Sequence, residues 1–290
     1  MKLAPECRDC LLTKVRTQAG QIIAYTEQVD RLVSACAKIF DDGVSKNLGA
    51  AVSAGEIHRF CYAQVNNQDL YADIKVRDNA RAKAVAEEVK PLLHTLHDTL
   101  IASVLGNAMD YGVTGHDVAE DFSCYFREVF AHGLALDDSE KFLPLSERVV
   151  FFTDNCGEVI FDMLFIEELK KAGSHVTVVV KDGPMLNDVT MKEAEMIGLF
   201  DVADAVYTGG GGALLGTHPQ AFPPEVSAAV ADATLLIAKG LANYESMTEY
   251  EISKPIAYLM MIKCDAVGRD VSQVSGRQVK KGDLVAYLRT

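Results

Sequence analysis

The hydrophobic pattern of the chain changes in kind near residue 146, and this change constrains the fold more than any other feature. Before it, apolar residues recur at helical spacing. In residues 27–42 they fall on one helix face: Val29, Leu32, Val33, Cys36, Ile39 and Phe40. Three further stretches share this pattern, namely residues 55–65, 79–105 and 117–133. Residues 1–145 are therefore predicted to form a mainly α-helical domain without a strand, in which Pro91 marks a kink or a helix start.

After residue 146, short β-branched runs alternate with helical stretches. The predicted strands are residues 148–154, 175–182, 202–209 and 233–240, with further strands within 255–268 and 283–290. The predicted helices between them are residues 158–173, 189–198, 223–232 and 243–251. The strand-like runs are apolar throughout, as in parallel strands covered on both faces. Residues 146–290 are thus predicted to form an open, mostly parallel α/β sheet.

Composition narrows the class of protein and of partner. The chain has 290 residues, of which 49% are hydrophobic, so it can bury a sizeable core. No apolar run reaches the ~18 residues of a membrane span, and the polar start "MKLAPECRDC" lacks the apolar part of a signal peptide. We expect the protein to be cytoplasmic and to have no membrane as a partner. The net charge of -13 argues against nucleic acid as a partner, but a small anion remains compatible where positive charge or a metal gathers locally.

The seven cysteines favour reduced thiols over a disulfide framework, because their number is odd and most lie in apolar helical patterns. Cys7 and Cys10 form a CxxC pair in "CRDC", but no second pair completes a zinc site. We interpret the pair as structural thiols. A non-catalytic metal-binding or thiol protein built around this motif is an alternative.

Polar or glycine-rich residues follow each of the four predicted strands. They include Asp154, Asn155 and Glu158, then Lys181, Asp182, Asn187 and Asp188, then Gly209 to Gly212, and finally Lys239 and Asn243. Ligands of an open parallel sheet bind beyond the carboxyl ends of its strands. The joint occurrence of these residues therefore indicates a site at this edge of the sheet.

Asp154 and Asn155 offer a carboxylate and an amide carbonyl, which are oxygen ligands suited to Mg²⁺, Mn²⁺ or a similar ion. Asp188 is the most plausible second carboxylate, with water in the open positions. The alternative is that Asp154 or Asn155 caps the helix that starts near Cys156. Both interpretations stay open, and both can hold for different residues.

The glycine-rich stretch and Lys239 each allow two interpretations. Gly209 to Gly212 can present backbone N–H groups to an anion or form a plain loop, and they lack the spacing of a phosphate-binding P-loop. Lys239 ends a buried strand, where a bound anion would pair with its ammonium, but it can also be an ordinary lysine at a strand edge.

Five short motifs occur in the order in which one known family carries them: "CRDC", "GNAMDYGV", "DNCGEVIFD", "KDGPMLNDVT" and "AKGLANYES". Together they resemble the metal-dependent damage-control phosphatases, also called domain of unknown function eighty-nine. The cysteine pair is similar to that of the archaeal and bacterial subgroup. Leu70 stands where a proline is often found in the family.

The resemblance implies a helical N-terminal domain packed on a Rossmann-like α/β sheet, with a divalent metal (Mn, Mg, Co or Ni) between them. By motif match, the metal ligands would be Asp154, Asn155 and Asp188. The catalytic residues would be Asp154 and Lys239, of which Lys239 contacts the substrate phosphate. The residues expected to bind substrate are Asn107, Asp110, Glu158, Asn243, Gly209 and Gly210.

The predicted function is hydrolysis of phosphomonoesters of small metabolites, either sugar phosphates or damaged phospho-metabolites. The metal and Lys239 would neutralise the phosphoryl oxygens, which is the main need in phosphoryl transfer. Either a metal-activated water or the Asp154 carboxylate would attack phosphorus. A nucleotide-binding or methyl-transferring α/β enzyme, holding an adenosine group at the glycine-rich loop, is the alternative in another class.

Overall fold

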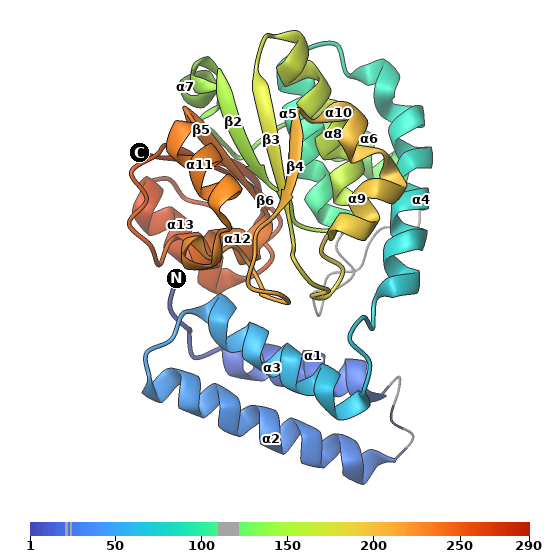
Figure 1. The fold of residues 1–290 in the computed structure, drawn as a ribbon, viewed down its shortest axis with the longest axis vertical. Coiled ribbons are helices and arrows are strands. Elements are labelled where there is room, and N and C mark those ends of the chain that lie inside the picture. Colours follow the sequence, from blue (N-terminus) through green and yellow to red (C-terminus); the bar gives the residue numbers. More distant parts are fainter. Residues whose placement is uncertain (21–22, 24, 110–121) are drawn as a thin grey trace.

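A seven-stranded sheet forms the centre of the molecule in the computed structural model, which describes residues 1–20, 23, 25–109 and 122–290 (Figure 1). The strand order is β1-β7-β6-β5-β2-β3-β4, and all neighbours are parallel except β6 and β7. The strands are β1 (Leu136–Asp137), β2 (Arg148–Phe152), β3 (His175–Val180), β4 (Ala205–Thr208), β5 (Leu235–Lys239), β6 (Ile256–Met261) and β7 (Leu284–Arg289). The predicted mostly parallel α/β class is confirmed.

Helices cover both faces of the sheet, and the apolar residues of each strand alternate between two cores. The larger core joins the sheet to α4 (Ala72–Val89), α5 (Leu96–Gly106), α6 (Phe122–His132), α8 (Glu158–Lys171), α9 (Met191–Ile197) and α10 (Leu199–Val202). The core on the other face includes α11 (Pro224–Asp232), α12 (Gly240–Met247) and α13 (Asp265–Ser275). Short elements complete the chain: α7 (Ser139–Phe142), η1 (Lys90–Leu92), η2 (Asn107–Met109), η3 (Leu143–Leu145) and η4 (Pro219–Ala221).

The first three helices form a separate layer, drawn in blue below the sheet in Figure 1. They are α1 (Cys7–Gly20), α2 (Thr26–Ser45) and α3 (Ala50–Val65), and they share their own apolar core. A small cluster joins this layer to the loops after β3 and β4, since Ala54 packs with Leu186 and Leu215. The domain boundary near residue 145 stays a prediction, although α4 to α6 pack directly on the sheet.

In the helical half, the predicted kink or helix start at Pro91 is confirmed, and the predicted absence of a strand is not. The stretch 79–105 is broken at Pro91: α4 ends at Val89, and α5 begins after a capping box in which the Thr95 side chain accepts a hydrogen bond from the Asp98 N–H. The expectation of no strand before residue 145 is wrong, because β1 pairs with β7. Its two residues are too short to show a pattern, and the pairing depends on a strand near the other end of the chain.

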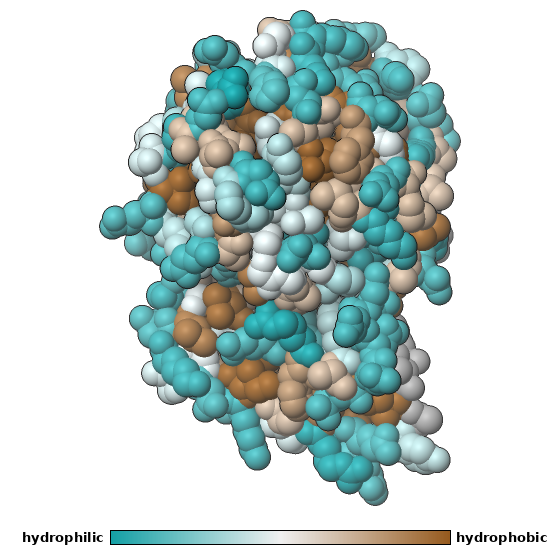
Figure 2. Space-filling view, in the orientation of Figure 1, coloured by the Kyte–Doolittle hydropathy of each residue, from teal (hydrophilic) through white to brown (hydrophobic). Residues whose placement is uncertain are grey.

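The order of the strands reverses beside β2, which lies between β3 and β5. Such a reversal leaves a crevice outside the carboxyl ends of the two central strands, where ligands of open α/β sheets bind. In the described part of the chain, no helix combines the length and apolarity needed to cross a membrane. Figure 2 shows hydrophilic residues over most of the visible face, with hydrophobic residues in scattered groups.

Candidate functional site

The backbone itself brings the predicted metal ligands together beyond β2 and β3. Asn155 and Asp188 form an isolated antiparallel bridge. The N–H of Cys156 donates to the Asn187 carbonyl at 2.8 Å, and the N–H of Val189 donates to the Asp154 carbonyl at 2.9 Å. Residues more than thirty positions apart are thus held at a spacing set by main-chain hydrogen bonds. Their roles as metal ligands stay a prediction.

Asp154 is a buried carboxylate with amide donors on one oxygen. Its Oδ2 accepts from Asn155 Nδ2 at 2.8 Å and from Asn107 Nδ2 at 3.3 Å. No Lys, Arg or His nitrogen of the described residues lies within 4.0 Å of this carboxylate. Burial, and then repulsion from Glu158 and Asp188, raises the pKa of Asp154 well above its ordinary value. This site therefore favours binding of positive charge.

The residues present fit a hard divalent ion through the chemistry of their oxygen donors. The Asn155 amide directs Nδ2 to Asp154 and to Glu158 Oε2, which leaves its carbonyl Oδ1 as the atom for a cation. Among the described residues, no group of three or more His, Cys, Asp or Glu side chains is arranged to hold a metal. The predicted set contains only two carboxylates, from Asp154 and Asp188, so the Asn155 carbonyl and water must supply the other donors.

The capping alternative for Asp154 and Asn155 is wrong. The N-cap of α8 is Gly157, which has φ +83° and no side-chain hydrogen bond to the helix. Its N–H donates to Asn79 Oδ1 of α4 at 2.6 Å instead. A left-handed residue at this position favours glycine and turns the chain from Asn155 into the helix.

Lys239, the last residue of β5, is fully buried inside an ion-pair network. Its Nζ lies 2.9 Å from Asp162 Oδ1 and 3.2 Å from Glu158 Oε1, and it also donates to the carbonyl of Ser103 at 2.6 Å and to its hydroxyl at 2.8 Å. Burial would lower the pKa of Lys239, but Asp162 and Glu158 raise it above its ordinary value. The ammonium is thus charged and already surrounded by oxygen. Its predicted contact with a substrate phosphate is untested.

Ser103 and Asp162 belong to this network but were not predicted from the sequence. Burial raises the pKa of Asp162 to about 7, with Lys239 opposing the shift and Glu158 adding to it. The Ser103 hydroxyl donates to Asp162 Oδ1 at 2.6 Å. One signal was available, because Glu158 and Asp162 are four residues apart in an apolar helix and so share a face.

Asn107 reaches the candidate site from the helical half of the chain, and its predicted role in substrate binding stays a prediction. Its Nδ2 donates to Glu158 Oε2 at 2.7 Å and to Asp154, while its Oδ1 accepts from the N–H of Met261 at 3.0 Å. The amide is fully buried and all of these contacts are within the protein. Asn107 is therefore placed to orient the two carboxylates. Asp110, also predicted to bind substrate, lies outside the described residues.

Asn243 connects this network to the glycine-rich loop. Its Oδ1 accepts from Lys181 Nζ at 3.1 Å and from the Thr217 hydroxyl at 2.8 Å. Its Nδ2 donates to the carbonyls of Thr153 and Lys239. Lys181 Nζ also lies 3.8 Å from Asp188 Oδ2. The ammonium of Lys181 thus stands between the carboxylate site and the loop, a place that the sequence indicated only by its position after β3.

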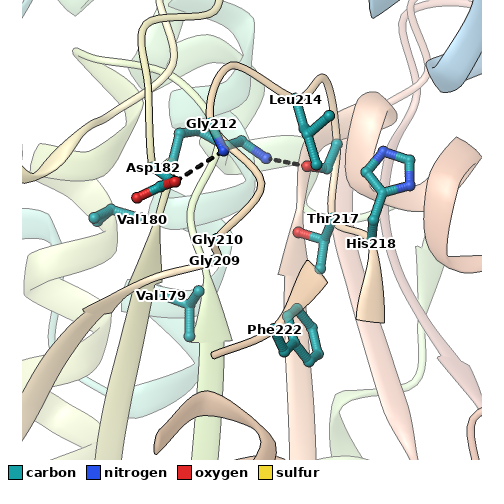
Figure 3. A pocket seen from close by; sticks show the side chains of 12 residues that line it. Val179, Val180, Asp182, Gly209, Gly210, Gly212, Leu214, Thr217, His218 and Phe222 are labelled. Carbon is teal, nitrogen blue, oxygen red and sulfur yellow. Dashed lines mark hydrogen bonds between the residues drawn. The ribbon is translucent and has the colours of Figure 1, made fainter. Parts of the chain in front are cut away.

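Gly209 and Gly210 line a cavity of about 20 Å³ beside Lys181, Asp182 and Thr217 (Figure 3). Asp182 Oδ2 accepts from the Gly212 N–H at 2.8 Å and fixes the loop, as the dashed line in Figure 3 marks. Gly210 has φ +71°, and a Cβ there would come within 2.1 Å of the Ala221 carbonyl. Packing therefore demands glycine at this position, whatever the loop binds.

The chain is similar over its whole length to known proteins. Residues 3–279 match the family model described as Damage-control phosphatase ARMT1-like domain. A protein of Archaeoglobus fulgidus named damage-control phosphatase is 35% identical, with 99% of each chain covered. The damage-control phosphatase PH1575 of Pyrococcus horikoshii is 27% identical, covering 98% of this chain and 97% of that protein. A crystal structure titled as a DUF89 family protein (PH1575) superposes with a TM-score of 0.87 over 100% of both chains, at 25% identity. The resemblance inferred from the five motifs is confirmed.

Proposed function

Because the chain belongs to the damage-control phosphatase ARMT1-like domain family, we propose that it is a phosphatase that requires a divalent metal and hydrolyses phosphomonoesters of small metabolites, either sugar phosphates or damaged phospho-metabolites. The names of the relatives from A. fulgidus and P. horikoshii support a phosphatase in general. One observation carries the metal-dependent part. Asp154, Asn155 and Asp188 stand together at the strand ends on a main-chain frame, and repulsion among buried carboxylates helps to raise the pKa of Asp154.

In this proposal Asp154, Asn155 and Asp188 hold a divalent ion (Mn, Mg, Co or Ni). When bound, such an ion supplies positive charge to the phosphoryl oxygens and so stabilises the transition state of phosphoryl transfer. The side chains around it have a positioning role. Asn107 and Asn155 both donate to Glu158 Oε2 and to Asp154 Oδ2, so the two carboxylates keep one orientation while substrate binds.

Two ammonium groups flank these carboxylates. Lys239 balances the charges of Glu158 and Asp162 on one side, and its predicted contact with the substrate phosphate requires that it exchange one of its present oxygen partners. Lys181 adds positive charge on the side of Asp188, next to the glycine-rich loop. Positive charge near the site is what a phosphate group needs in a chain whose net charge is -13.

The attacking group is either a water molecule or the Asp154 carboxylate, which would form an aspartyl phosphate. Rapid acid quenching followed by peptide mass spectrometry distinguishes the two. A phosphoryl group on Asp154 supports covalent attack, and its absence under single-turnover conditions with measurable product supports water.

The decisive experiment is a phosphate-release assay on the purified protein. The substrates are p-nitrophenyl phosphate and a panel of phosphorylated metabolites, each measured with Mn²⁺, Mg²⁺, Co²⁺ or Ni²⁺ and again after chelation. We expect release that depends on one or more of these ions. Release that is equal after chelation contradicts the metal requirement, and no release with any ion or substrate contradicts the phosphatase itself.

The two rival functions gain no specific support. The cavity lined by Gly209 and Gly210 has about 20 Å³, which is close to the room for a single water and too small for an adenosine group. Cys7 and Cys10 are free thiols at the start of α1, and Cys7 packs against the core of the first three helices.

A further inference from the structure

Arg59 of α3 presents a guanidinium without a carboxylate partner to the gap between α3 and the loops of the sheet. Its Nη1 donates to the carbonyl of Ala213, in the loop after β4, at 3.1 Å. Its side chain folds back over its own helix, since a Cβ built on Gly55 would lie 3.4 Å from Nη1. Within the described part of the chain, no Asp or Glu oxygen lies within 4.0 Å of this group.

Acidic partners for arginine are plentiful in this protein. The sequence holds 41 acidic residues against 28 basic ones. Six other arginines pair with carboxylates: Arg8, Arg16, Arg77, Arg148, Arg269 and Arg277. A half-buried guanidinium that keeps four of its five N–H donors for other partners is suited to an anion from outside the protein.

Two cavities meet at Arg59. The larger, of about 630 Å³, has a size typical of small-molecule sites and is also lined by Tyr62, Asn66, Asn67 and Gln68. The smaller, of about 270 Å³, continues toward His218 and Tyr250. None of the described residues that line either cavity is Asp or Glu.

The larger cavity adjoins the small cavity beside Lys181. Gly212 lines both this cavity and the small one that contains Lys181. Gly183 and Pro184, which also line it, belong to the loop that leads from Lys181 to Asp188. His218 lines the small cavity with Lys181 and the cavity of about 270 Å³ with Arg59. Burial lowers the pKa of His218 first, a hydrogen bond with the Leu215 carbonyl opposes the shift, and Lys181 and Arg59 lower the pKa further. The imidazole is therefore neutral near pH 7, so Lys181 and Arg59 supply the positive charge of these cavities.

We propose that this cleft takes phosphomonoesters that carry a second anionic group, such as a carboxylate or a second phosphate, and that Arg59 binds this second group. The proposal rests on the proposed phosphatase function, whose reacting phosphate lies at the Asp154 and Lys181 end. Asn66, Asn67 and Gln68 line the same cavity as Arg59, and their amide side chains can bind hydroxyl groups of the substrate.

The test uses two compounds that differ in one group. 6-Phosphogluconate carries a carboxylate where sorbitol 6-phosphate carries a hydroxymethyl group. For the wild type we expect kcat/KM to favour 6-phosphogluconate by at least about tenfold, as a charge-assisted hydrogen bond permits. The substitution Arg59→Met should bring this ratio close to one, and Arg59→Lys should keep part of it. The matched control Arg31→Met, at an exposed arginine of α2, should keep the full ratio.

Calorimetric binding of the same two compounds gives a readout that does not depend on turnover. Equal kcat/KM and equal affinity for the two compounds in the wild type overturn the proposal. The proposal is also overturned if folded Arg59→Met keeps the wild-type preference for 6-phosphogluconate, or if this variant loses kcat/KM equally for both compounds. If neither these compounds nor any substrate of the panel is hydrolysed with any divalent ion, the phosphatase function fails, and the affinities in wild type and Arg59→Met still decide the role of Arg59.

Discussion

The backbone of Gly240 lies directly against the carboxylate of Asp154. A Cβ built on Gly240 would come within 1.7 Å of Asp154 Oδ2, and Gly240 itself has φ +74°, a conformation that L side chains rarely adopt. The first residue of α12 is thus glycine for two reasons, of which the contact with Asp154 concerns the site.

Replacing Gly240 by alanine should therefore displace the Asp154 carboxylate. We expect Gly240→Ala to weaken Mn²⁺ binding by about 10- to 100-fold, the range seen when a group that supports a metal ligand is lost. Isothermal calorimetry with Mn²⁺ measures this directly. The matched control is Gly276→Ala, at the end of α13, because Gly276 has a similar φ of +69° and open space around its missing Cβ. That variant should lose about 1 to 2 kcal/mol of stability and keep its metal affinity. Equal metal affinity in the two variants contradicts the prediction.

Removing the charge of Asp154 should lower the activity without lowering the stability of the protein. In Asp154→Asn we expect metal-stimulated activity to fall at least about 100-fold, because a ligand matters more than the groups that support it. Without metal, the melting temperature should stay level or rise, since the buried carboxylate is repelled by Glu158 and Asp188. Phosphate release and thermal unfolding with and without Mn²⁺ measure both effects. Asp73→Asn, at an exposed residue of α4, serves as the control. Full activity in Asp154→Asn ends the proposal.

Replacing Lys239 should lower the free energy of unfolding strongly, and a second substitution at Asp162 should restore part of it. Lys239→Met removes the cation that lies between Glu158 and Asp162, and a broken buried ion pair costs about 3 to 5 kcal/mol. Adding Asp162→Asn should recover part of that loss, because one of the two stranded charges is removed. Urea unfolding of the four proteins in this cycle gives the coupling. Additive effects of the two substitutions count against the network.

His58 of α3 should make the protein less stable in mild acid. It is fully buried, and burial lowers its pKa to about 3, so the folded state keeps it neutral while the unfolded state gains a proton below pH 6.5. Stability from this residue is complete above pH 6.5 and falls as pH decreases toward 3. Between pH 7 and pH 5 the expected loss is about 2 kcal/mol.

The measurement is the free energy of unfolding at both pH values for wild type and His58→Gln. The difference between pH 7 and pH 5 should be smaller in the variant by about 2 kcal/mol. His132→Gln, at an exposed position, should retain the wild-type difference. The same difference in all three proteins would show that His58 is not the group responsible.

Local pattern was enough to predict most of the sheet. The apolar runs at residues 148–154, 175–182, 202–209 and 233–240 contain β2 to β5, because strands buried on both faces leave a continuous apolar signal. β1 and the antiparallel course of β7 gave no such signal. β1 depends on pairing with a strand about 150 positions away, as between Leu136 and Val285, and the course of β7 is decided by its pairing with β6, as between Met261 and Leu284.

The residues of the candidate site also divide into those that the sequence pattern predicted and those that depend on packing between distant segments. Asp154, Asn155, Asp188 and Asn243 could be found because the carboxyl ends of parallel strands meet at one edge. The partners of Lys239 could not, since Ser103 lies on a helix of the other half of the chain and its carbonyl becomes an acceptor only through packing. Arg59 was missed for a similar reason. Its significance depends on which carboxylates are absent around it, and a sequence does not list neighbours in space.

The main-chain bridge between Asn155 and Asp188 has a consequence for how such a site can change over time. Because hydrogen bonds of the backbone set the separation of the two positions, the donor atoms can be exchanged without rebuilding the loops that carry them. A single substitution of amide for carboxylate alters the charge offered to an ion and leaves the distance between the side-chain attachment points intact. The preference for one ion over another can therefore evolve without a change in the backbone that holds the site.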